Sequence, residues 1–241
     1  MVKILDILKG LGSNTLYYPG CMLKSVMTTE QENYKKIFNK LGIDFIMIPN
    51  GEVCCGSPVI NAGYKKDAKI LAKKNYDLFK KHNVTKIVTP CAGCYNMFQN
   101  EYPKLLREWD IEVEHATQTI LKELKKRKTD YASKEIVSYH DPCHLGRYSQ
   151  IYDEPREIIK LLGGELKEMK HNRNNALCCG AGAGMRANYP DIAKDIAKKR
   201  MNEKPKDAEW VLTPCGLCTA NLKTADDKVV EFSTWVLGRM K

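Results

Sequence analysis

The 241-residue sequence lacks any apolar run approaching the roughly 20 residues that a membrane-spanning helix needs. Its amphipathic start, residues 1–14, is interrupted by Lys3, Asp6 and Lys9 and has no cleavage site, which excludes a signal-peptide core. We expect a helix there that packs on its own domain, or that docks on a partner or membrane surface. We therefore expect a cytoplasmic protein, membrane-associated at most through a partner, whose thiols serve metal binding or redox chemistry rather than disulfides.

The sequence also lacks a dense stripe of basic residues interleaved with aromatics, although its formal net charge is +10. The 39 lysines and arginines are spread over lysine-rich helical segments such as YKKDAKILAKKN, which begins at Tyr64. This distribution argues against a nucleic-acid surface, and we expect no nucleic-acid partner. The positive charge also suits an anion bound inside the protein, which the formal count leaves out.

Cysteine, in contrast, is abundant and follows an internal repeat. Each half of the chain contains a single cysteine, then an adjacent pair, then Cys-x2-Cys, and the phrases YYPGC, CCGSP and VTPCAGC correspond to YHDPC, CCGAG and LTPCGLC. Matching cysteines lie 122 residues apart at the first position (143 − 21) and 124 apart at the others (178 − 54, 215 − 91). The repeat predicts two similar structural units. The two sets are Cys21, Cys54, Cys55, Cys91 and Cys94, and Cys143, Cys178, Cys179, Cys215 and Cys218.

Short apolar segments ending in turn residues predict strands, and longer amphipathic segments predict helices between them. The alternation predicts an α/β fold of two pseudo-repeated lobes, each a small parallel sheet flanked by helices. We place the lobes at 15–128 and 129–241, joined through the polar run 121–134. The predicted strands are 15–19, 44–49, 86–90, 135–142, 164–169 and 209–214, and the predicted helices are 25–41, 64–82, 154–162, 187–202 and the terminal segment 229–241.

The predicted strands place the cysteines at one edge of each sheet. Four of them directly follow a strand, and ligands of open α/β sheets bind at the carboxyl ends of the strands. Each Cys-x2-Cys would begin a helix whose free amides can donate to an anionic group. The doublets lie in loops with glycine, where the chain can approach a bulky ligand closely. We therefore expect five thiolates to converge in each lobe.

Five thiolates restrict the metal chemistry. Zinc takes four ligands in closed tetrahedral sites, so two zinc sites would leave two spare thiols; this alternative stays open. Ordinary iron–sulfur cubanes also take four cysteines, commonly with the spacing C-x2-C-x2-C, which is absent from this sequence. Five ligands with an adjacent pair indicate a cluster with an extra or shared iron coordination position.

The whole pattern resembles the cysteine-rich CCG domain family. Its members include the B-type and D-type catalytic chains of heterodisulfide reductase, iron–sulfur subunits of glycolate, lactate and glycerol-3-phosphate oxidising complexes, and thiol-dependent fumarate reductase. The resemblance covers residues 15–222, and CCGSPVINAGY, VTPCAGCYNMF, YHDPCHLGR and CCGAGAGMR are most similar to the D-type branch. It implies that each set of five cysteines holds a noncubane [4Fe-4S] cluster. It also implies a methanogenesis-type protein that reduces or forms a heterodisulfide such as CoM-S-S-CoB, placed between the two clusters.

The resemblance also implies partners. Relatives of the D type usually carry two cubane clusters in an N-terminal ferredoxin-like domain, which has no counterpart in this sequence. A ferredoxin-type subunit, with a flavoprotein or a membrane cytochrome, would therefore deliver the electrons. One alternative is an electron-relay subunit of a flavin-dependent 2-hydroxy acid oxidase or fumarate reductase; another is a zinc-binding interaction module.

Two histidines beside Cys143 are candidate catalytic residues. His140 and His144 could deliver a proton to a thiolate released from a disulfide, because histidine titrates near neutral pH. The structural alternative is a loop held by hydrogen bonds, with Asp141 capping a following helix. His115, after the strand-like IEVE, could likewise face the cleft.

Basic residues near the cysteines are candidates for binding an anionic disulfide substrate. Each of them could equally be a surface charge or a charge at a helix end. They are Lys24, Arg147, Arg173 and Arg186. The GAGAG run at 180–184 follows no clean strand, so we interpret it as space for a cluster rather than as a dinucleotide loop.

Overall fold

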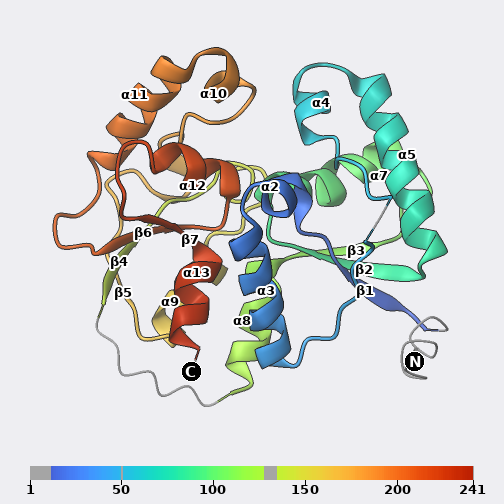
Figure 1. The fold of residues 1–241 in the computed structure, drawn as a ribbon, viewed down its shortest axis with the longest axis horizontal. Coiled ribbons are helices and arrows are strands. Elements are labelled where there is room, and N and C mark those ends of the chain that lie inside the picture. The colour runs from blue at the N-terminus through green and yellow to red at the C-terminus, as the bar shows by residue number, and fades with distance from the viewer. Residues whose placement is uncertain (1–11, 50, 128–134, 241) are drawn as a thin grey trace.

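The computed structural model describes residues 12–49, 51–127 and 135–240 (Figure 1). Each half of the chain forms its own parallel sheet, and helices flank both sheets. The predicted α/β fold with two pseudo-repeated lobes is therefore confirmed. The predicted helix within residues 1–14 and the polar end of the joint, 128–134, lie largely outside the described residues.

The first sheet has the strand order β1-β2-β3 and is parallel throughout. Its strands are β1 (Asn14–Tyr17), β2 (Val84–Thr89) and β3 (Glu112–His115). The prediction of a strand over 44–49 is wrong in length, because only Ile46 pairs with β1. Ile46 accepts from the Tyr17 amide and donates to the Thr15 carbonyl, both at 2.9 Å, and the chain then turns away toward the first cysteine doublet.

The helices of the first half cover this sheet and lead into the cysteine loops. They are α2 (Gly20–Ser25), α3 (Thr28–Leu41), α4 (Ser57–Asn61), α5 (Lys65–Lys81), α6 (Ala92–Asn96), the π-helix η1 (Met97–Glu101), α7 (Tyr102–Leu105) and α8 (Ala116–Lys125). The prediction over 64–82 is confirmed by α5, whereas 25–41 divides into the end of α2 and all of α3. Helix α3 buries Tyr34, Ile37 and Phe38 on one face, the spacing of an amphipathic helix.

The second sheet has the order β5-β4-β6-β7, again parallel. The predicted strand 164–169 shrinks to the two residues of β5, and the segment 229–241 begins as a strand before it becomes helical. The strands are β4 (Ile136–Tyr139), β5 (Glu165–Leu166), β6 (Trp210–Thr213) and β7 (Val229–Glu231). The helices are α9 (Asp153–Leu161), the 3-10 turn η2 (Arg173–Asn175), α10 (Met185–Asn188), α11 (Pro190–Met201), α12 (Gly216–Leu222) and α13 (Phe232–Arg239).

Four helices between the two sheets join the halves (Figure 1). Helix α3 packs against α13, and α8 packs against α9, so each contact pairs a helix of one half with a helix of the other. Buried side chains from both halves form one core in this layer, including Phe38, Ile120, Ile158 and Phe232. Since apolar burial is the main stabilising term in folding, this shared core makes the two lobes one packed unit.

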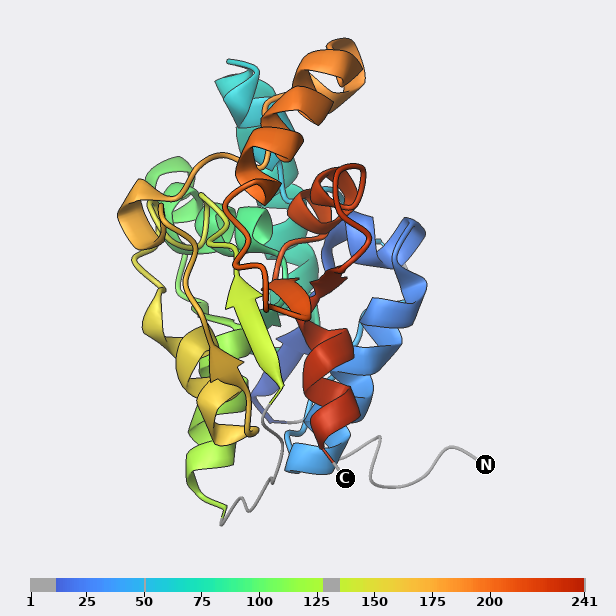
Figure 2. The ribbon, with the colours of Figure 1, turned by 90° about the vertical axis from the view of Figure 1, so that its left-hand side faces the viewer.

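The outer helices define the end of the molecule where the cysteine loops begin. In Figure 1 and in the side view of Figure 2, α4 and α11 lie at the end opposite the carboxyl terminus. These two helices follow the two cysteine doublets in the chain. In the described part of the chain, no helix combines the length and the apolar character required to cross a bilayer.

Candidate functional site

The five cysteines of the first half form a series of neighbouring thiols. Cys21 lies in α2, the doublet precedes α4, and Cys91 caps α6, which contains Cys94. Neighbouring thiols shift the pKa values of one another in four pairs, Cys21 with Cys54, Cys54 with Cys55, Cys55 with Cys94, and Cys94 with Cys91. Cys55 and Cys94 are buried and Cys21 is exposed, so this first site reaches solvent on the Cys21 side.

Backbone geometry shapes the first site around sulfur. The Gly56 amide donates to Cys54 Sγ at 3.4 Å, and the Cys94 amide donates to Cys91 Sγ at 3.5 Å. Gly56 has φ +90°, a conformation that glycine adopts without strain. A Cβ at Gly20 would lie 3.0 Å from Cys94 Sγ. Glycine therefore lets the backbone stay close to the thiols.

The second site repeats this construction with the cysteines of the second half. Cys218 Sγ donates to Cys179 Sγ at 3.1 Å, and the neighbouring Cys178 and Cys215 shift the pKa values of these two thiols. Burial, and then the charges of Cys179 and Cys215, raise the pKa of Cys143, which places that thiol beside the others. Cys178 is exposed, whereas Cys179 and Cys218 are buried. Each half therefore brings its cysteines to neighbouring positions, and in the described part of the chain the ligand atoms of Cys179, Cys218 and His140 form the group that lies within 4.8 Å.

In each site, contacts among the thiols lower the pKa of some members and raise the pKa of others. A hydrogen bond from Cys21 is the main cause that lowers the pKa of Cys54 to about 2. In the second site, a hydrogen bond from Cys178 likewise lowers the pKa of Cys179. Because the thiolate is the form that binds metal, both sites are suited to a cationic metal centre.

The two sites lie next to each other across the interface of the halves. Gly216, which follows Cys215, packs so closely on the first half that an added Cβ would lie 3.0 Å from Met27 Sδ. The Cys215 side chain packs against two hydrophobic clusters, one made mostly of first-half residues and one made of second-half residues. A second contact between the halves is a hydrogen bond from the Asn100 side chain of the first half to the Tyr148 carbonyl of the second half, at 3.2 Å. Helix α2, which contains Cys21, therefore lies in contact with α12, which contains Cys218.

His140 lies beneath the second site and is buried. Its Nδ1 accepts a hydrogen bond from the Nε of Arg200 at 3.0 Å, and its ring lowers the pKa of Cys179. The ligand atoms of His140, Cys179 and Cys218 all lie within 4.8 Å of one another. Arg200 was not anticipated from its lysine-rich surroundings. The available signal was its helical phase, since it follows the buried Ala193 and Ala197 on the same face of α11.

His144 and His115 have different roles in the structure. His144 is half-buried, its Nδ1 lies 3.5 Å from Cys143 Sγ, and burial lowers its pKa. His115 is fully buried, caps α8 by accepting from the Thr117 amide, and contacts the Pro90 carbonyl at 3.2 Å. Burial lowers the pKa of His115 to about 3, so its ring is neutral. His115 therefore stabilises a helix start rather than facing an open cleft.

The prediction that Asp141 caps a following helix is wrong. The described residues that follow, 142–149, form turns. The Asp141 carboxylate instead accepts two hydrogen bonds from Arg156, at 2.8 and 2.9 Å, and one from the Arg173 amide at 2.8 Å. This buried ion pair ties the loop of Cys143 to α9 and to the loop that leads to the second doublet.

The candidate anion-binding residues differ in their availability. Lys24 and Arg173 each form an ion pair with a carboxylate, at 3.4 and 2.7 Å. Arg147 donates to a backbone carbonyl at 2.8 Å, and its charge favours the thiolate of Cys143 against the effect of burial. Arg186 is exposed on α10 and pairs with no carboxylate among the described residues. Arg147 and Arg186 are therefore the best placed to meet an anionic ligand.

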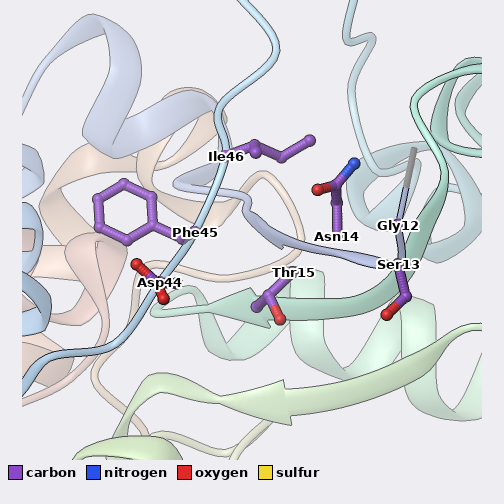
Figure 3. A pocket seen from close by; sticks show the side chains of 7 residues that line it. All are labelled: Gly12, Ser13, Asn14, Thr15, Asp44, Phe45 and Ile46. Atoms are coloured by element: carbon purple, nitrogen blue, oxygen red, sulfur yellow. The ribbon is translucent and has the colours of Figure 1, made fainter. Parts of the chain in front are cut away.

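A separate pocket of about 240 Å³ lies at the beginning of β1 (Figure 3). The cysteines follow the carboxyl end of β1, so this pocket is at the opposite end of the strand and is not part of either thiol site. It is lined by Gly12, Ser13, Asn14, Thr15, Asp44, Phe45 and Ile46.

The paired five-thiol sites agree with a comparison to known families. The family model described as the cysteine-rich domain, CCG, matches residues 15–99 and again residues 137–223. The chain belongs to the cysteine-rich CCG domain family. The two matches cover the two halves of the chain and all ten cysteines.

Several members of this CCG family are similar over most of this chain. The D-type chain of the dihydromethanophenazine:CoB–CoM heterodisulfide reductase of Methanosarcina acetivorans is 34% identical over 236 residues, 95% of this chain and 56% of that protein. An iron–sulfur protein of Methanocaldococcus jannaschii is 34% identical over 86% of this chain and 40% of its own length. The B-type chain of the CoM/CoB fumarate reductase of Methanothermobacter marburgensis is 30% identical over 90% of this chain and 43% of its own length.

These relatives indicate the kind of protein and cofactor site to which the CCG chain is related. The chain is related to iron–sulfur redox subunits, and its cysteine-rich sites are of the kind that binds an iron–sulfur cofactor. It spans about half or less of the length of these relatives.

Proposed function

We propose that the chain binds two noncubane [4Fe-4S] clusters, one in each five-thiol site, and takes part in the two-electron cleavage of an anionic disulfide or in its reverse. The observation that supports this most is the convergence of five thiols, twice, at adjacent sites. Zinc and ordinary cubane clusters need only four ligands each, so the fifth thiol would have no purpose in either.

The residues around the thiols fit an anionic cluster. Glycine amides donate to Cys54 and Cys178, as expected around sulfur that carries negative charge. The guanidinium of Arg200 is buried, and its Nη2 has no acceptor among the described residues. A negatively charged group held by Cys179 and Cys218 would balance that charge. When bound, such clusters supply or accept single electrons at the cysteines.

The chain's own residues would then bind the disulfide and manage its protons. Cys21 and Cys178 are the exposed members of the two sites, so a disulfide would approach on that side. Arg147 and Arg186 would bind its anionic groups. Cleavage of the S–S bond would require two electrons, which clusters bound in the two sites would supply, and the two thiolates released would each take up one proton. His144, half-buried beside Cys143, would donate one of these protons.

The partner complex is part of the same proposal. A reduced ferredoxin-type subunit, supported by a flavoprotein or membrane cytochrome, would supply the two electrons, since the relatives are subunits of larger reductases. The substrate would be a mixed disulfide of the CoM-S-S-CoB class, the compound named for the relative from Methanosarcina acetivorans. The units that we assign to the two clusters are residues 15–128 and 129–241.

The test is disulfide turnover by the anaerobically reconstituted chain with reduced methyl viologen, an artificial one-electron donor. We expect two viologens to be oxidised for each CoM-S-S-CoB cleaved, with two thiols released. A variant with Cys54 and Cys55 both changed to serine should lose this activity. Reversible reduction of bound clusters without any disulfide turnover would overturn the catalytic role. That outcome would favour the electron-relay function suggested by the likeness to the B-type chain of fumarate reductase.

A further inference from the structure

The two thiol sites differ in the side chains buried beneath them. In the repeated phrases YYPGC and YHDPC, Tyr18 occupies the position of His140. On the longer helix that follows each doublet, α5 or α11, Asn75 follows Cys55 by 20 residues (75 − 55), and Arg200 follows Cys179 by 21 (200 − 179), one residue further along. Tyr18 is thus the counterpart of His140, Asn75 lies within one residue of the position that matches Arg200, and all four side chains are buried.

Beneath the first site these counterparts are neutral and hold the backbone. The Tyr18 hydroxyl donates to the Val53 carbonyl at 2.8 Å. Asn75 accepts from the Val53 amide at 3.1 Å and donates to the carbonyls of Val53 and Cys54 at 3.3 Å. Among the described residues of the first half, the buried side chains include no lysine or arginine. The doublet is positioned, but no buried cation faces its sulfurs.

Beneath the second site the counterparts carry a charge and a directed hydrogen bond. Arg200 Nε donates to His140 Nδ1 at 3.0 Å, and Nη1 donates to the His171 carbonyl and to Glu203, both at 2.7 Å. A guanidinium can only donate, so Nδ1 of His140 must be the acceptor and the ring proton is on Nε2. A ring nitrogen of the same imidazole lies within 4.8 Å of the Sγ atoms of Cys179 and Cys218, and His140 lowers the pKa of Cys179. Arg200 thus selects the His140 tautomer whose Nε2–H can donate to the thiolate.

This arrangement affects the cost of adding an electron. One-electron reduction of a cluster adds one negative charge and, by itself, moves no proton. Hydrogen bonds to cluster sulfurs and buried positive charge stabilise the more negative state and raise the reduction potential. Glu203 offsets part of the Arg200 charge, but Nη2 is left without an acceptor among the described residues, and the guanidinium also interacts with Cys218.

We propose that Arg200 is a positioning residue which, through His140, directs a hydrogen bond to Cys179 Sγ and makes a cluster in the second site easier to reduce than one in the first. This inference depends on the proposed cluster binding. The first electron to enter the chain then resides in the second half, whichever site receives it from the donor.

The test is a redox titration of the reconstituted full chain with dithionite, followed by electron paramagnetic resonance. We expect two one-electron transitions whose equilibrium constants differ at least tenfold, that is by about 59 mV or more. In Arg200→Gln, the equilibrium constant for reduction at the transition of higher potential should fall at least tenfold. The transition of lower potential should not change. Lys199→Gln removes the same charge from the neighbouring, exposed position of α11 and should change neither.

The histidine variants separate positioning from a general structural role. His140→Leu should lower the same transition, and adding Arg200→Gln should lower it little further, because the two residues act in series. His140→Gln, which can accept from Arg200 and donate to Cys179, should restore much of the potential. If Arg200→Gln fails to fold, as judged by circular dichroism, the potentials of His140→Leu and His140→Gln are compared instead, and a higher potential in His140→Gln supports the inference.

Two results would overturn the inference while leaving cluster binding intact. One is coincident transitions in the wild-type chain with both clusters present. The other is an unchanged midpoint potential for the transition of higher potential in a folded His140→Leu or Arg200→Gln variant. A wild-type chain with no acid-labile sulfide would instead contradict the proposed function and this inference together.

Discussion

The Tyr34 hydroxyl donates to Glu231 Oε1 at 2.8 Å across the boundary between the two halves. Tyr34 lies on α3 and Glu231 ends β7, where its other oxygen accepts from the Ser233 amide at 2.7 Å and caps α13. His115 has the matching place at the end of β3, where it caps α8 with Thr117. A buried carboxylate therefore links the lobes at a position where the repeat otherwise uses a neutral ring.

Glu231 gives stability a pH dependence. Burial raises the pKa of Glu231 from 4.5 to about 7, so the folded state binds this proton more tightly than the unfolded state. Its contribution is greatest below pH 4.5, declines as the pH rises to about 7, and is constant above that. Glu231→Gln should remove a decline of about 3 kcal/mol at most. Urea unfolding at a series of pH values across this range measures the free energy of unfolding of both proteins. The same pH dependence of that free energy in the wild type and in Glu231→Gln would contradict the assignment. Glu32→Gln, at an exposed site, is the control.

The Asp141–Arg156 pair should matter far more than an exposed ion pair. Asp141→Asn leaves Arg156 buried with half of its carboxylate partners, and breaking a buried pair costs about 3–5 kcal/mol. Asp195→Asn breaks the exposed pair with Lys198 and should cost less than about 1 kcal/mol. Denaturant unfolding of both variants tests this. Equal losses of unfolding free energy in the two variants would show that the buried pair contributes no more to stability than the exposed pair.

Gly180 should be required for the second site. It has φ +85°, and an added Cβ would lie 2.6 Å from the Ala193 carbonyl oxygen. The left-handed backbone alone costs an alanine about 1–2 kcal/mol, and the clash adds to that. We expect Gly180→Ala to lose the iron of the second site and keep that of the first. Gly182→Ala, with nothing within 4 Å of its Cβ, should retain both. Iron analysis of the two purified variants gives the answer, and full iron in Gly180→Ala would be the contrary result.

The repeated cysteine pattern predicted the two lobes and the convergence of each five-cysteine set, because strand ends and short spacings are local features. Contacts made between distant segments were not predictable in the same way. Arg200 is buried only because α11 packs over His140, and Asp141 pairs with Arg156 instead of capping a helix. Residues 44–49 have the composition of a strand, yet tertiary packing leaves only Ile46 paired.

His144 should affect turnover without affecting assembly. Its position 3.5 Å from Cys143 Sγ suits proton donation to a departing thiolate, a contribution of about 10²–10⁴ in rate. His144→Gln should lower disulfide turnover by about that factor, with its iron content unchanged. His82→Gln is the control, because His82 lies at the end of β1 away from the cysteines. Its backbone carbonyl accepts a hydrogen bond from the Asn14 side chain there. Wild-type turnover in His144→Gln would exclude the proton-donor role.

The most direct test of the account is a count of iron and acid-labile sulfide in the anaerobically reconstituted chain. Two four-iron clusters require about eight irons per chain. Changing both Cys54 and Cys55 to serine, or both Cys178 and Cys179, should leave about four irons each, because the sites are built from separate halves of the chain. Tightly bound zinc without labile sulfide in the wild-type chain would contradict the account.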